Sequence, residues 1–519
     1  LPSGDELFRD VSFSVRSGDR AALVGANGVG KTSLLRIVTG EQAATAGTVS
    51  AGGTIGVMHQ LVGMNGPGGD APADVTSLLL SLSPERHRRA RERLAAAEAD
   101  LGDDPMRYAE ALSAWGDAGG YDLEVQWDEA CGRALGADFR DVADRPLRTL
   151  SGGEQKRLAL EFLLRGEAEL LVLDEPDNFL DVPAKRWLER ELNATRKTVL
   201  FVSHDRELLA GAATKIVTIE ASGAWTHGGG FAGYAEAKSA HAEKRARDAA
   251  HFDDERKRLE DLVAELRRRA HISEVFAPKL KAAESRLRQF LEKNERPVEV
   301  RDQRIDVRLR GARTGKRAVT TEALSIDGLT DPFDLELWYG ERVAVLGGNG
   351  VGKSHFLRLL GGDDGVDHDG RWKLGAGVVP GSFHQTHEHP EWFGRTPVEI
   401  LHDHDVVLAP AMGMLRRYEL QGCAHQPFET MSGGQQARLQ ILLLEVSGAT
   451  LLLLDEPTDN LDLVSAEALE AGLGRFDGTV IAVTHDRWFL RGFDRFVVFG
   501  DDCTVTDHLD CPAEWRSNA

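Results

Sequence analysis

The stretch GANGVGKT at residues 25–32 decides the fold, because it recurs as GGNGVGKS at residues 347–354. Each copy follows a short apolar run, at residues 21–24 and 343–346, and precedes a segment of helix-like composition. A strand, a glycine-rich loop and a helix in this order form the phosphate-binding loop of α/β nucleotide-binding domains. Two such loops in one chain predict two domains of this class.

Three further motifs recur in the same order. LSGGEQ at 150–155 recurs as MSGGQQ at 431–436, LLVLDEP at 170–176 as LLLLDEP at 451–457, and FVSHDR at 201–206 as AVTHDR at 482–487. Ser151 and Asp174 are 23 positions apart, and so are Ser432 and Asp455. The chain is therefore a tandem duplication. We expect the first domain at residues 1–235 and the second at residues 318–519.

The first copy carries an insertion. Gln60 and Ser151 are 91 positions apart, whereas the matching Gln385 and Ser432 are 47 apart. Residues 84–101 are rich in Ala, Arg, Glu and Leu and open with proline, which is typical of a helix start. We expect a protruding helical arm within an insertion at about residues 84–128. A surface elaboration without a role is the alternative.

A charged segment at residues 236–317 joins the two copies. It contains 23 Lys and Arg against 16 Asp and Glu, in a chain whose net charge is −21. Helices are predicted over about 236–269 and 279–293, and Pro278 separates them. The residues that form their apolar stripes are Leu259, Leu262, Val263, Leu266, Leu280, Leu287 and Leu291. The prediction is a helical hairpin with a basic shoulder at residues 267–269, and a solvated spacer is the alternative.

Composition restricts the class of protein. Hydrophobic residues make up 42% and charged residues 28%, as in ordinary globular proteins. No apolar run approaches the roughly 18 residues of a membrane-spanning helix, so no membrane insertion is expected. The 4 cysteines form no CxxC pair, which fits a reducing compartment. With no signal segment after Leu1, the expected location is cytoplasmic.

The two loops point to ATP and Mg²⁺. Their glycines let backbone N–H groups surround phosphates, their lysines reach the β- and γ-phosphates, and the hydroxyl after each lysine is placed for Mg²⁺. The predicted nucleotide-binding residues are Gly25, Asn27, Gly28, Gly30, Lys31, Thr32 and Ser33, and then Gly347, Asn349, Gly350, Gly352, Lys353, Ser354 and His355. The predicted Mg²⁺ ligands are Thr32, Asp174, Ser354 and Asp455. Glu175 and Glu456 are predicted to accept a proton from the attacking water.

The SGG segments, 23 residues before an acidic strand end, resemble the signature of ATP-binding cassette (ABC) ATPases. The resemblance implies that each domain has a mixed sheet with helices and a helical subdomain. It implies that Gln60 and Gln385 approach nucleotide and Mg²⁺, and that His204 and His485 act near the γ-phosphate. It also implies a monomer whose cassettes pair head to tail. Lys31 would then share a site with Ser432, Gly433 and Gly434, and Lys353 with Ser151, Gly152 and Gly153.

Two cassettes, an arm and a charged linker of about 80 residues resemble the ABC-F family. The resemblance implies that the linker, a coiled coil, enters the ribosome and approaches rRNA and the P-site tRNA. ATP hydrolysis at two composite sites would then drive a conformational cycle in translation. Some members protect ribosomes from antibiotics, so resistance of this kind is one expected role. The alternative function is a fused ATPase pair that works with the separate membrane subunits of an ABC transporter.

The sequence departs from the family pattern in three places. The hairpin tip at residues 270–278 is short and not especially basic, so a long loop that reaches into a drug site is not expected. The segments DNFLD at 177–181 and TDNLD at 458–462 replace the usual TNHLD of the D-loop. The aromatic residue that stacks on adenine has no clear counterpart, and Phe333 is the one aromatic close to the expected place in the second copy. A histidine cluster also invites a metal interpretation, although structural or exposed histidines are the favoured one. Its members are His384, His387, His389, His402 and His404.

Overall fold

The computed structural model describes residues 7–60, 72–99, 105–294, 296, 305–311, 315–384 and 389–516. The chain forms two compact units. One comprises Leu1–Phe231 with Arg304–Ala519 and contains both cassettes, and the other is Ala232–Gln303. Gln385 and His387, two of the predicted site residues, lie outside the described residues.

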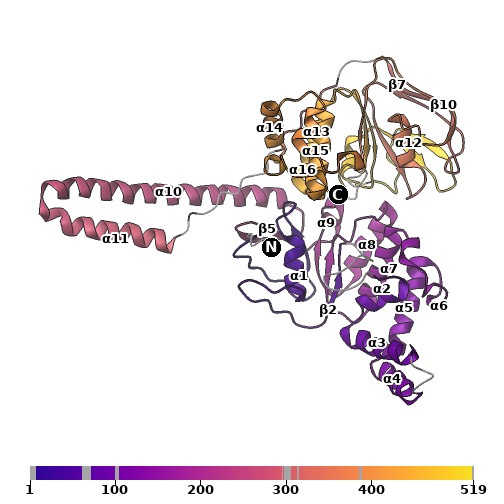
Figure 1. Cartoon of the computed structure of the whole chain (residues 1–519), viewed down its shortest axis with the longest axis horizontal. Coiled ribbons are helices and arrows are strands. Elements are labelled where there is room, and N and C mark those ends of the chain that lie inside the picture. The colour runs from indigo at the N-terminus through magenta and orange to yellow at the C-terminus, as the bar shows by residue number, and fades with distance from the viewer. Residues whose placement is uncertain are drawn as a thin grey trace. The chain divides into compact units, whose positions relative to one another are not determined.

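The first cassette is built on a sheet with strand order β2-β3-β4-β1-β5-β6, in which β6 alone of the described strands is antiparallel (Figure 1). The strands are β1 (Arg20–Val24), β2 (Ile55–Met58), β3 (Leu170–Asp174), β4 (Thr198–Val202), β5 (Lys215–Glu220) and β6 (Gly223–Gly228). The helices next to them are α1 (Lys31–Thr39), α7 (Gly152–Arg165), α8 (Val182–Ala194) and α9 (Arg206–Ala212). Because β1, β3 and β4 are parallel, the segments that follow them meet at one sheet edge, where ligands of such sheets bind.

The second cassette repeats this topology with the order β11-β12-β13-β9-β14-β15. The strands are β9 (Arg342–Gly347), β11 (Pro380–Phe383), β12 (Leu451–Asp455), β13 (Thr479–Val483), β14 (Arg495–Phe499) and β15 (Val505–His508). The helices are α12 (Lys353–Leu360), α13 (Pro397–His402), α14 (Leu408–Arg417), α15 (Gly433–Val446) and α16 (Leu463–Gly474). A three-stranded antiparallel sheet joins it, with β7 (Arg317–Ile326), β8 (Phe333–Trp338) and β10 (His368–Leu374). The predicted fold of two α/β cassettes is confirmed.

The insertion in the first cassette is helical, as expected. Its helices are α3 (Glu85–Ala99), α4 (Pro105–Asp117) and α5 (Gly120–Leu135), and α2 (Val75–Leu82) and α6 (Phe139–Val142) flank it. The predicted helix at 84–101 is α3, which packs against α4. Trp115 and Trp127 are almost fully buried between these helices, with ring centroids 6.3 Å apart. Their burial gives the arm an apolar core of its own.

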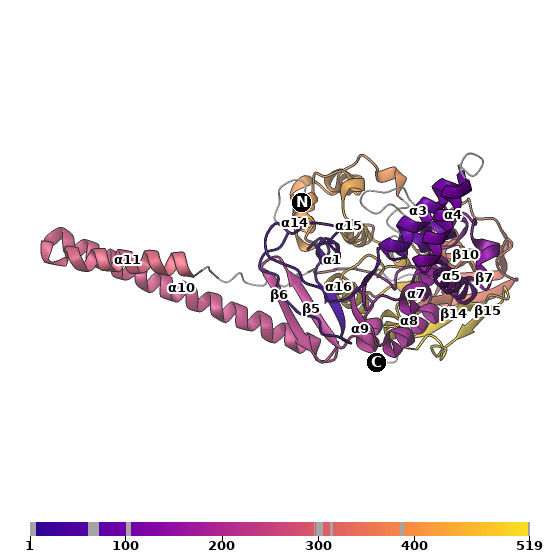
Figure 2. The same cartoon turned by 90° about the horizontal axis from the view of Figure 1, so that it is seen from below.

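The second unit is the predicted hairpin, in which α10 (Tyr234–Ile272) and α11 (Ala277–Lys293) run side by side (Figures 1 and 2). Phe252 stacks on Phe290 with ring centroids 5.0 Å apart, and Leu259 and Val263 are buried. The prediction that Leu262 belongs to the apolar stripe is wrong, because its side chain is 42% exposed. One residue corresponds to 100° of helix rotation, so a narrow seam through Leu259 and Val263 leaves Leu262 outside.

Leu291 is likewise 47% exposed, against the prediction that it faces the partner helix. The neighbouring Phe290, which is half-buried, faces the partner helix instead and stacks on Phe252. Beyond the hairpin, the described residues 305–311 of the charged segment contact the second cassette. Val307 and Leu309 are buried in the core of the second cassette. The basic residues around them therefore belong to the surface of that cassette.

Candidate functional site

The first phosphate-binding loop lies between β1 and α1. Gly28 has a φ of 78° and Gly30 a φ of 102°, a region in which a side chain would be strained. The Nζ atom of Lys31 donates hydrogen bonds to the carbonyl oxygens of Gly25 at 2.9 Å and Ala26 at 3.2 Å. The loop thus surrounds the ammonium group of Lys31. This group lies at the N-terminus of α1, where the helix favours the binding of an anion.

The second loop, between β9 and α12, repeats this geometry. Gly350 and Gly352 have φ values of 84° and 99°. The Nζ atom of Lys353 donates to the carbonyl oxygens of Gly347 at 2.9 Å and Gly348 at 2.5 Å. The other predicted residues also occupy matching places, with Asn27 and Asn349 in the loops and Thr32, Ser33, Ser354 and His355 in the first turns of α1 and α12.

Asp174 ends β3 beside the first loop. The hydroxyl group of Thr32 hydrogen-bonds to its carboxylate. The Oδ1 atom of Asp174 is buried and has no hydrogen-bond partner among the described residues. A carboxylate oxygen next to a hydroxyl group is the kind of ligand that Mg²⁺ takes in proteins. The residues present therefore fit a Mg²⁺ ion at this place.

Glu175 follows Asp174 and is held by two amide groups. Its Oε2 atom accepts hydrogen bonds from Nε2 of Gln60 and Nδ2 of Asn178, each at 2.6 Å. Burial raises the pKa of Glu175 to about 7, and the negative charges of Asp174 and Asp177 act in the same direction. A buried carboxylate with a pKa near neutrality is suited to accept a proton at physiological pH.

Glu456 in the second cassette has different partners. Its Oε2 atom accepts a hydrogen bond from the backbone N–H of His485 at 3.0 Å, and Nε2 of His485 lies 3.5 Å from Oε1. Burial raises the pKa of Glu456 to about 8. The ring of Trp515 stacks on His485 with centroids 5.7 Å apart. This tryptophan is a neighbour of the site that the sequence did not indicate.

The corresponding histidine of the first cassette, His204, lies close to the first loop. Burial, with the positive charge of Lys31, lowers the pKa of His204 to about 3. The ring is therefore neutral at physiological pH. A neutral imidazole offers one N–H donor and one acceptor to a bound group.

The first loop faces the second cassette. The backbone N–H of Asn27 donates to Oδ2 of Asp462 at 3.1 Å, and its Nδ2 donates to the carbonyl oxygen of Asn460 at 2.9 Å. A cavity of about 400 Å³ lies between them. It is lined by Lys31, Thr32, Gln60, Glu175 and His204 from one cassette and by Ser432, Gly433 and Gly434 from the other. The structure thus brings Lys31 and the second signature to one site.

The second loop faces the first cassette in the same way. Nδ2 of Asn349 donates to the carbonyl oxygen of Phe179 at 3.4 Å, and Asp181 acts electrostatically on Lys353. A Cβ atom on Gly153 would lie 2.9 Å from the Phe179 oxygen, so only glycine fits there. The signature serines, Ser151 and Ser432, cap the N-termini of α7 and α15. The two cassettes therefore pair head to tail.

A buried lysine lies among acids of both cassettes. The Nζ atom of Lys185 lies 3.1 Å from Oδ2 of Asp205, and both side chains are less than 10% exposed. Asp177 of the first cassette and Asp459 and Asp486 of the second also act on it electrostatically. Its counterpart in the second cassette is Ala466. One lysine therefore neutralises an acidic cluster, defined here as Asp177, Asp205, Asp459 and Asp486, that spans the interface.

Two buried arginines also cross the interface. Arg206 of the first cassette pairs with Glu470 and lies 3.6 Å from Asp486 of the second. Arg487 of the second cassette pairs with Glu189 of the first. These contacts join residues that are far apart in the chain, so no local pattern predicted them.

Two other sequence-based candidates lie elsewhere. Phe333 is buried in the core of the second cassette against Phe356 and Phe499, so it cannot stack on a base. His389 stacks on Trp392 with ring centroids 3.8 Å apart. Among the described residues, which include His384, His389, His402 and His404, no group of three or more His, Cys, Asp or Glu side chains is arranged to hold a metal ion.

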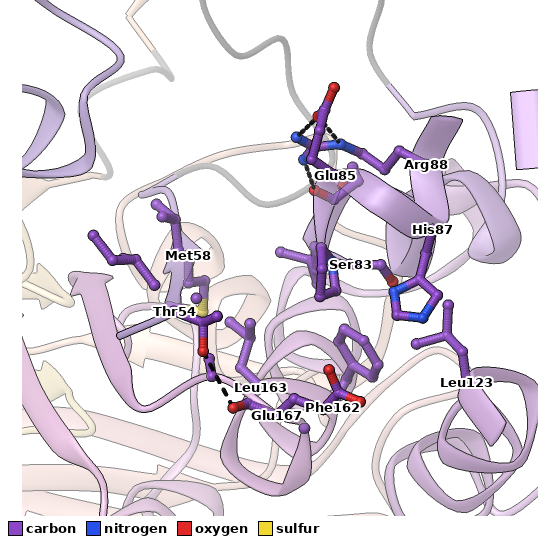
Figure 3. A pocket seen from close by; sticks show the side chains of 18 of the residues that line it. Thr54, Met58, Ser83, Glu85, His87, Arg88, Leu123, Phe162, Leu163 and Glu167 are labelled. Atoms are coloured by element: carbon purple, nitrogen blue, oxygen red, sulfur yellow. Dashed lines mark hydrogen bonds and ion pairs between the residues drawn. The ribbon is translucent and has the colours of Figure 1, made fainter. Parts of the chain in front are cut away.

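A larger cavity, of about 680 Å³, lies between β2, α2, α3, α5 and α7 (Figure 3). Its walls include the apolar side chains of Met58, Leu123, Phe162 and Leu163. Glu85 and Arg88 form an ion pair at its rim (Figure 3). No described residue of either phosphate-binding loop lines it. The candidate nucleotide site is therefore the smaller cavity between the cassettes.

Comparisons with known proteins agree with this geometry. A family described as "ABC transporter" matches residues 8–178 and 330–459. An "Antibiotic resistance protein" of Mycobacteroides abscessus is 50% identical, and the match covers 98% of this chain and 97% of the relative. The "Tylosin resistance ATP-binding protein TlrC" of Streptomyces fradiae is 33% identical over 93% of this chain and 92% of its own length. No described helix is long and apolar enough to cross a membrane.

A third relative is named for translation. The "Energy-dependent translational throttle protein EttA" of Mycobacterium tuberculosis is 30% identical, and the match covers 94% of this chain and 87% of the relative. Among solved structures, an "RNase-L Inhibitor" aligns over 93% of this chain and 84% of its own, with a TM-score of 0.52 and 17% identity. This structural likeness extends to the fold of the paired cassettes.

Proposed function

The chain belongs to the ABC-F family of tandem ATP-binding cassette ATPases, and from this premise we propose that it acts on the ribosome. ATP binding and hydrolysis at the two composite sites drive a conformational cycle of the cassettes. The hairpin at residues 232–303 carries that cycle to rRNA and tRNA. In this proposal the protein is a cytoplasmic monomer whose two cassettes form the ATPase dimer within one chain.

In each site the phosphate-binding loop of one cassette and the signature of the other enclose one ATP. Lys31 and Lys353 bind the β- and γ-phosphates, and the backbone N–H groups of the loops bind the remaining phosphate oxygens. Thr32 and Asp174 hold Mg²⁺ in the first site, and Ser354 and Asp455 hold it in the second, with Gln60 and Gln385 as further ligands. Bound Mg²⁺ neutralises negative charge on the phosphates as the bond breaks.

Glu175 and Glu456 accept the proton of the attacking water. Burial raises their pKa values, to about 7 for Glu175 and about 8 for Glu456, so each carboxylate is a stronger base than a free glutamate. His204 and His485 contact the γ-phosphate and hold it in line with the water. The two signature segments complete the sites only when the cassettes are closed, so hydrolysis is coupled to their opening.

One observation carries the ribosome proposal: the free end of the hairpin is basic. Residues 265–288 contain 7 Lys and Arg against 3 Asp and Glu, in a chain with a net charge of −21. Ile272 and Val275 at the turn are 87% and 75% exposed. Positive charge neutralises RNA phosphates, and exposed apolar side chains pack against unstacked bases. The acidic remainder of the chain limits unspecific binding to RNA.

The relatives suggest two outcomes of this cycle. EttA is named for translation, and TlrC and the Mycobacteroides protein are named for antibiotic resistance. We propose that this chain acts in translation and that it protects the ribosome from an antibiotic.

The hairpin provides a direct test. Replacing Arg267, Arg268 and Arg269 by glutamate reverses three charges near the turn, where the side chains are 57–76% exposed. We expect ribosome binding in the presence of a non-hydrolysable ATP analogue to weaken by about tenfold or more, because phosphate contacts are lost. Basal ATPase activity should stay within about twofold of the unchanged protein, because the cassettes are untouched. Ribosome pelleting and phosphate release measure the two quantities.

A matched control reverses three charges farther from the turn on α10, at Lys244, Arg247 and Lys257, which are also exposed. This variant should keep most of its ribosome binding. Equal losses of ribosome binding in both triple variants would mean that binding depends on the overall charge of the hairpin. Unchanged binding in both variants would contradict the proposal. In that case the fused ATPase pair of a transporter would become the better assignment, and membrane subunits should be sought.

A further inference from the structure

The surroundings of the two general-base glutamates differ at two positions. Aligned from the signature serine, LSGGEQK places Lys156 where MSGGQQA has Ala437. Aligned from the glutamate, EPDN places Asn178 where EPTD has Asp459. The first cassette thus has two donors near its glutamate that the second cassette lacks.

Lys156 acts on the backbone of the first glutamate. Its side chain is only 2% exposed, and its Nζ atom donates a hydrogen bond to the carbonyl oxygen of Glu175. Glu175 has a φ of 50°, a left-handed conformation that is strained for a residue with a Cβ atom. A hydrogen bond from a charged donor stabilises the carbonyl in this orientation.

The same lysine reaches the next turn of the chain. Its Nζ atom lies 5.4 Å from the centre of the Phe179 ring. The carbonyl oxygen of Phe179 in turn accepts the hydrogen bond from Asn349 of the second phosphate-binding loop. Lys156 therefore fixes the segment from Glu175 to Phe179 at both of its ends.

Asn178 acts on the side chain of Glu175. With Gln60 it donates to the same oxygen, Oε2, at 2.6 Å. Two donors on one oxygen fix the plane of the carboxylate and leave Oε1 to accept a proton. Asp459 at the matching place is an acceptor, and its charge acts against that of Glu456.

We propose that Lys156 and Asn178 are positioning residues that hold Glu175 ready for hydrolysis and make the site at Lys31 faster than the site at Lys353. The inference rests on the proposed roles of Glu175 and Glu456 as general bases. It adds an order to the cycle, in which the ATP bound by the first loop is cleaved first.

Two single-site enzymes test the proposal. Glu456→Gln leaves hydrolysis to the first site, and Glu175→Gln leaves it to the second. We expect the first enzyme to turn over about tenfold faster than the second. Adding Lys156→Met or Asn178→Asp to the first enzyme should lower kcat by about tenfold, with KM for ATP within about twofold, because positioning acts on the transition state. Lys156→Arg should restore most of the activity, because it keeps the charged donor.

The same changes in the Glu175→Gln enzyme are the matched control. They should lower kcat much less than in the Glu456→Gln enzyme, because Lys156 and Asn178 reach the second site only through the backbone of Phe179. A merely structural role of Lys156 would lower activity equally in both backgrounds and overturn the proposal, as would equal rates of the two single-site enzymes. Hydrolysis that survives in Glu175→Gln/Glu456→Gln would instead contradict the general-base roles themselves.

Single-turnover hydrolysis by the otherwise unchanged protein is a second measurement that does not need single-site enzymes. We expect a fast and a slow phase of similar amplitude. Lys156→Met should slow the fast phase by about tenfold and affect the slow phase much less. One uniform phase in the unchanged protein, or equal slowing of both phases, would overturn the proposal.

Discussion

The double variant Glu175→Gln/Glu456→Gln is expected to hydrolyse ATP at least about 10²-fold more slowly than the unchanged protein, because both general bases are lost. ATP binding should persist. Glutamine has the shape of glutamate, and the loops that bind the phosphates are untouched. Loss of a buried charge from each site should also favour the closed form with ATP bound. Phosphate release measures hydrolysis, and filter binding of labelled ATP measures retention.

A matched control replaces two exposed acids, Glu92 in the first cassette and Glu322 in the second, by glutamine. This variant should hydrolyse ATP within about twofold of the unchanged protein, because surface substitutions rarely act at a distant site. Undiminished hydrolysis in Glu175→Gln/Glu456→Gln would contradict the assignment of both glutamates. Loss of ATP binding would mean that they act on nucleotide affinity rather than on the water.

Lys185→Met is expected to destabilise the pair of cassettes by about 3–5 kcal/mol, the usual cost of leaving buried charges without their partner. The acidic cluster would retain four carboxyl groups and lose the buried lysine that pairs with Asp205. Thermal denaturation should report a lower Tm for the variant. Arg190→Met, on the exposed face of the same helix, is the matched control and should leave Tm nearly unchanged.

The cost of Lys185→Met should depend on pH. Burial raises the pKa of Asp177 and raises that of Asp459 to about 6, while Lys185 lowers both pKa values. Removing the lysine raises them further above their unfolded values, so the folded variant binds more protons than the unfolded chain. Its stability must then increase as pH falls. We expect the loss in Tm to be smaller at pH 5.5 than at pH 8, and a loss independent of pH would contradict the role of the cluster.

The phosphate-binding loops and acidic strand ends were predictable because their function depends on short local patterns. A glycine at a left-handed φ, a lysine and a hydroxyl must follow one another within 8 residues, as in residues 25–32. The hairpin was predictable from helical spacing and from Pro278. The exact residues that form the contact between its two helices were not predictable. The contact is narrow, so an apolar residue such as Leu262 or Leu291 can lie one position outside it.

The buried lysines could not be predicted in this way. Lys156 and Lys185 are single charged residues in helices, and such residues usually face solvent. Their partners come from β-strand ends and from the other cassette, up to several hundred residues away in the sequence. A comparison of the two copies gave one available signal, because Ala437 and Ala466 stand at the matching places. Trp515 had no such signal, since its contact with His485 depends on where the chain folds back.

The most direct test of the ribosome proposal is sedimentation of Glu175→Gln/Glu456→Gln with ribosomes through a sucrose gradient, with and without ATP. Our account predicts that the protein migrates with ribosomes when ATP is present and remains near the top of the gradient without it. Absence of the protein from the ribosome fractions, under conditions in which ATP binding is verified, would contradict a function on the ribosome.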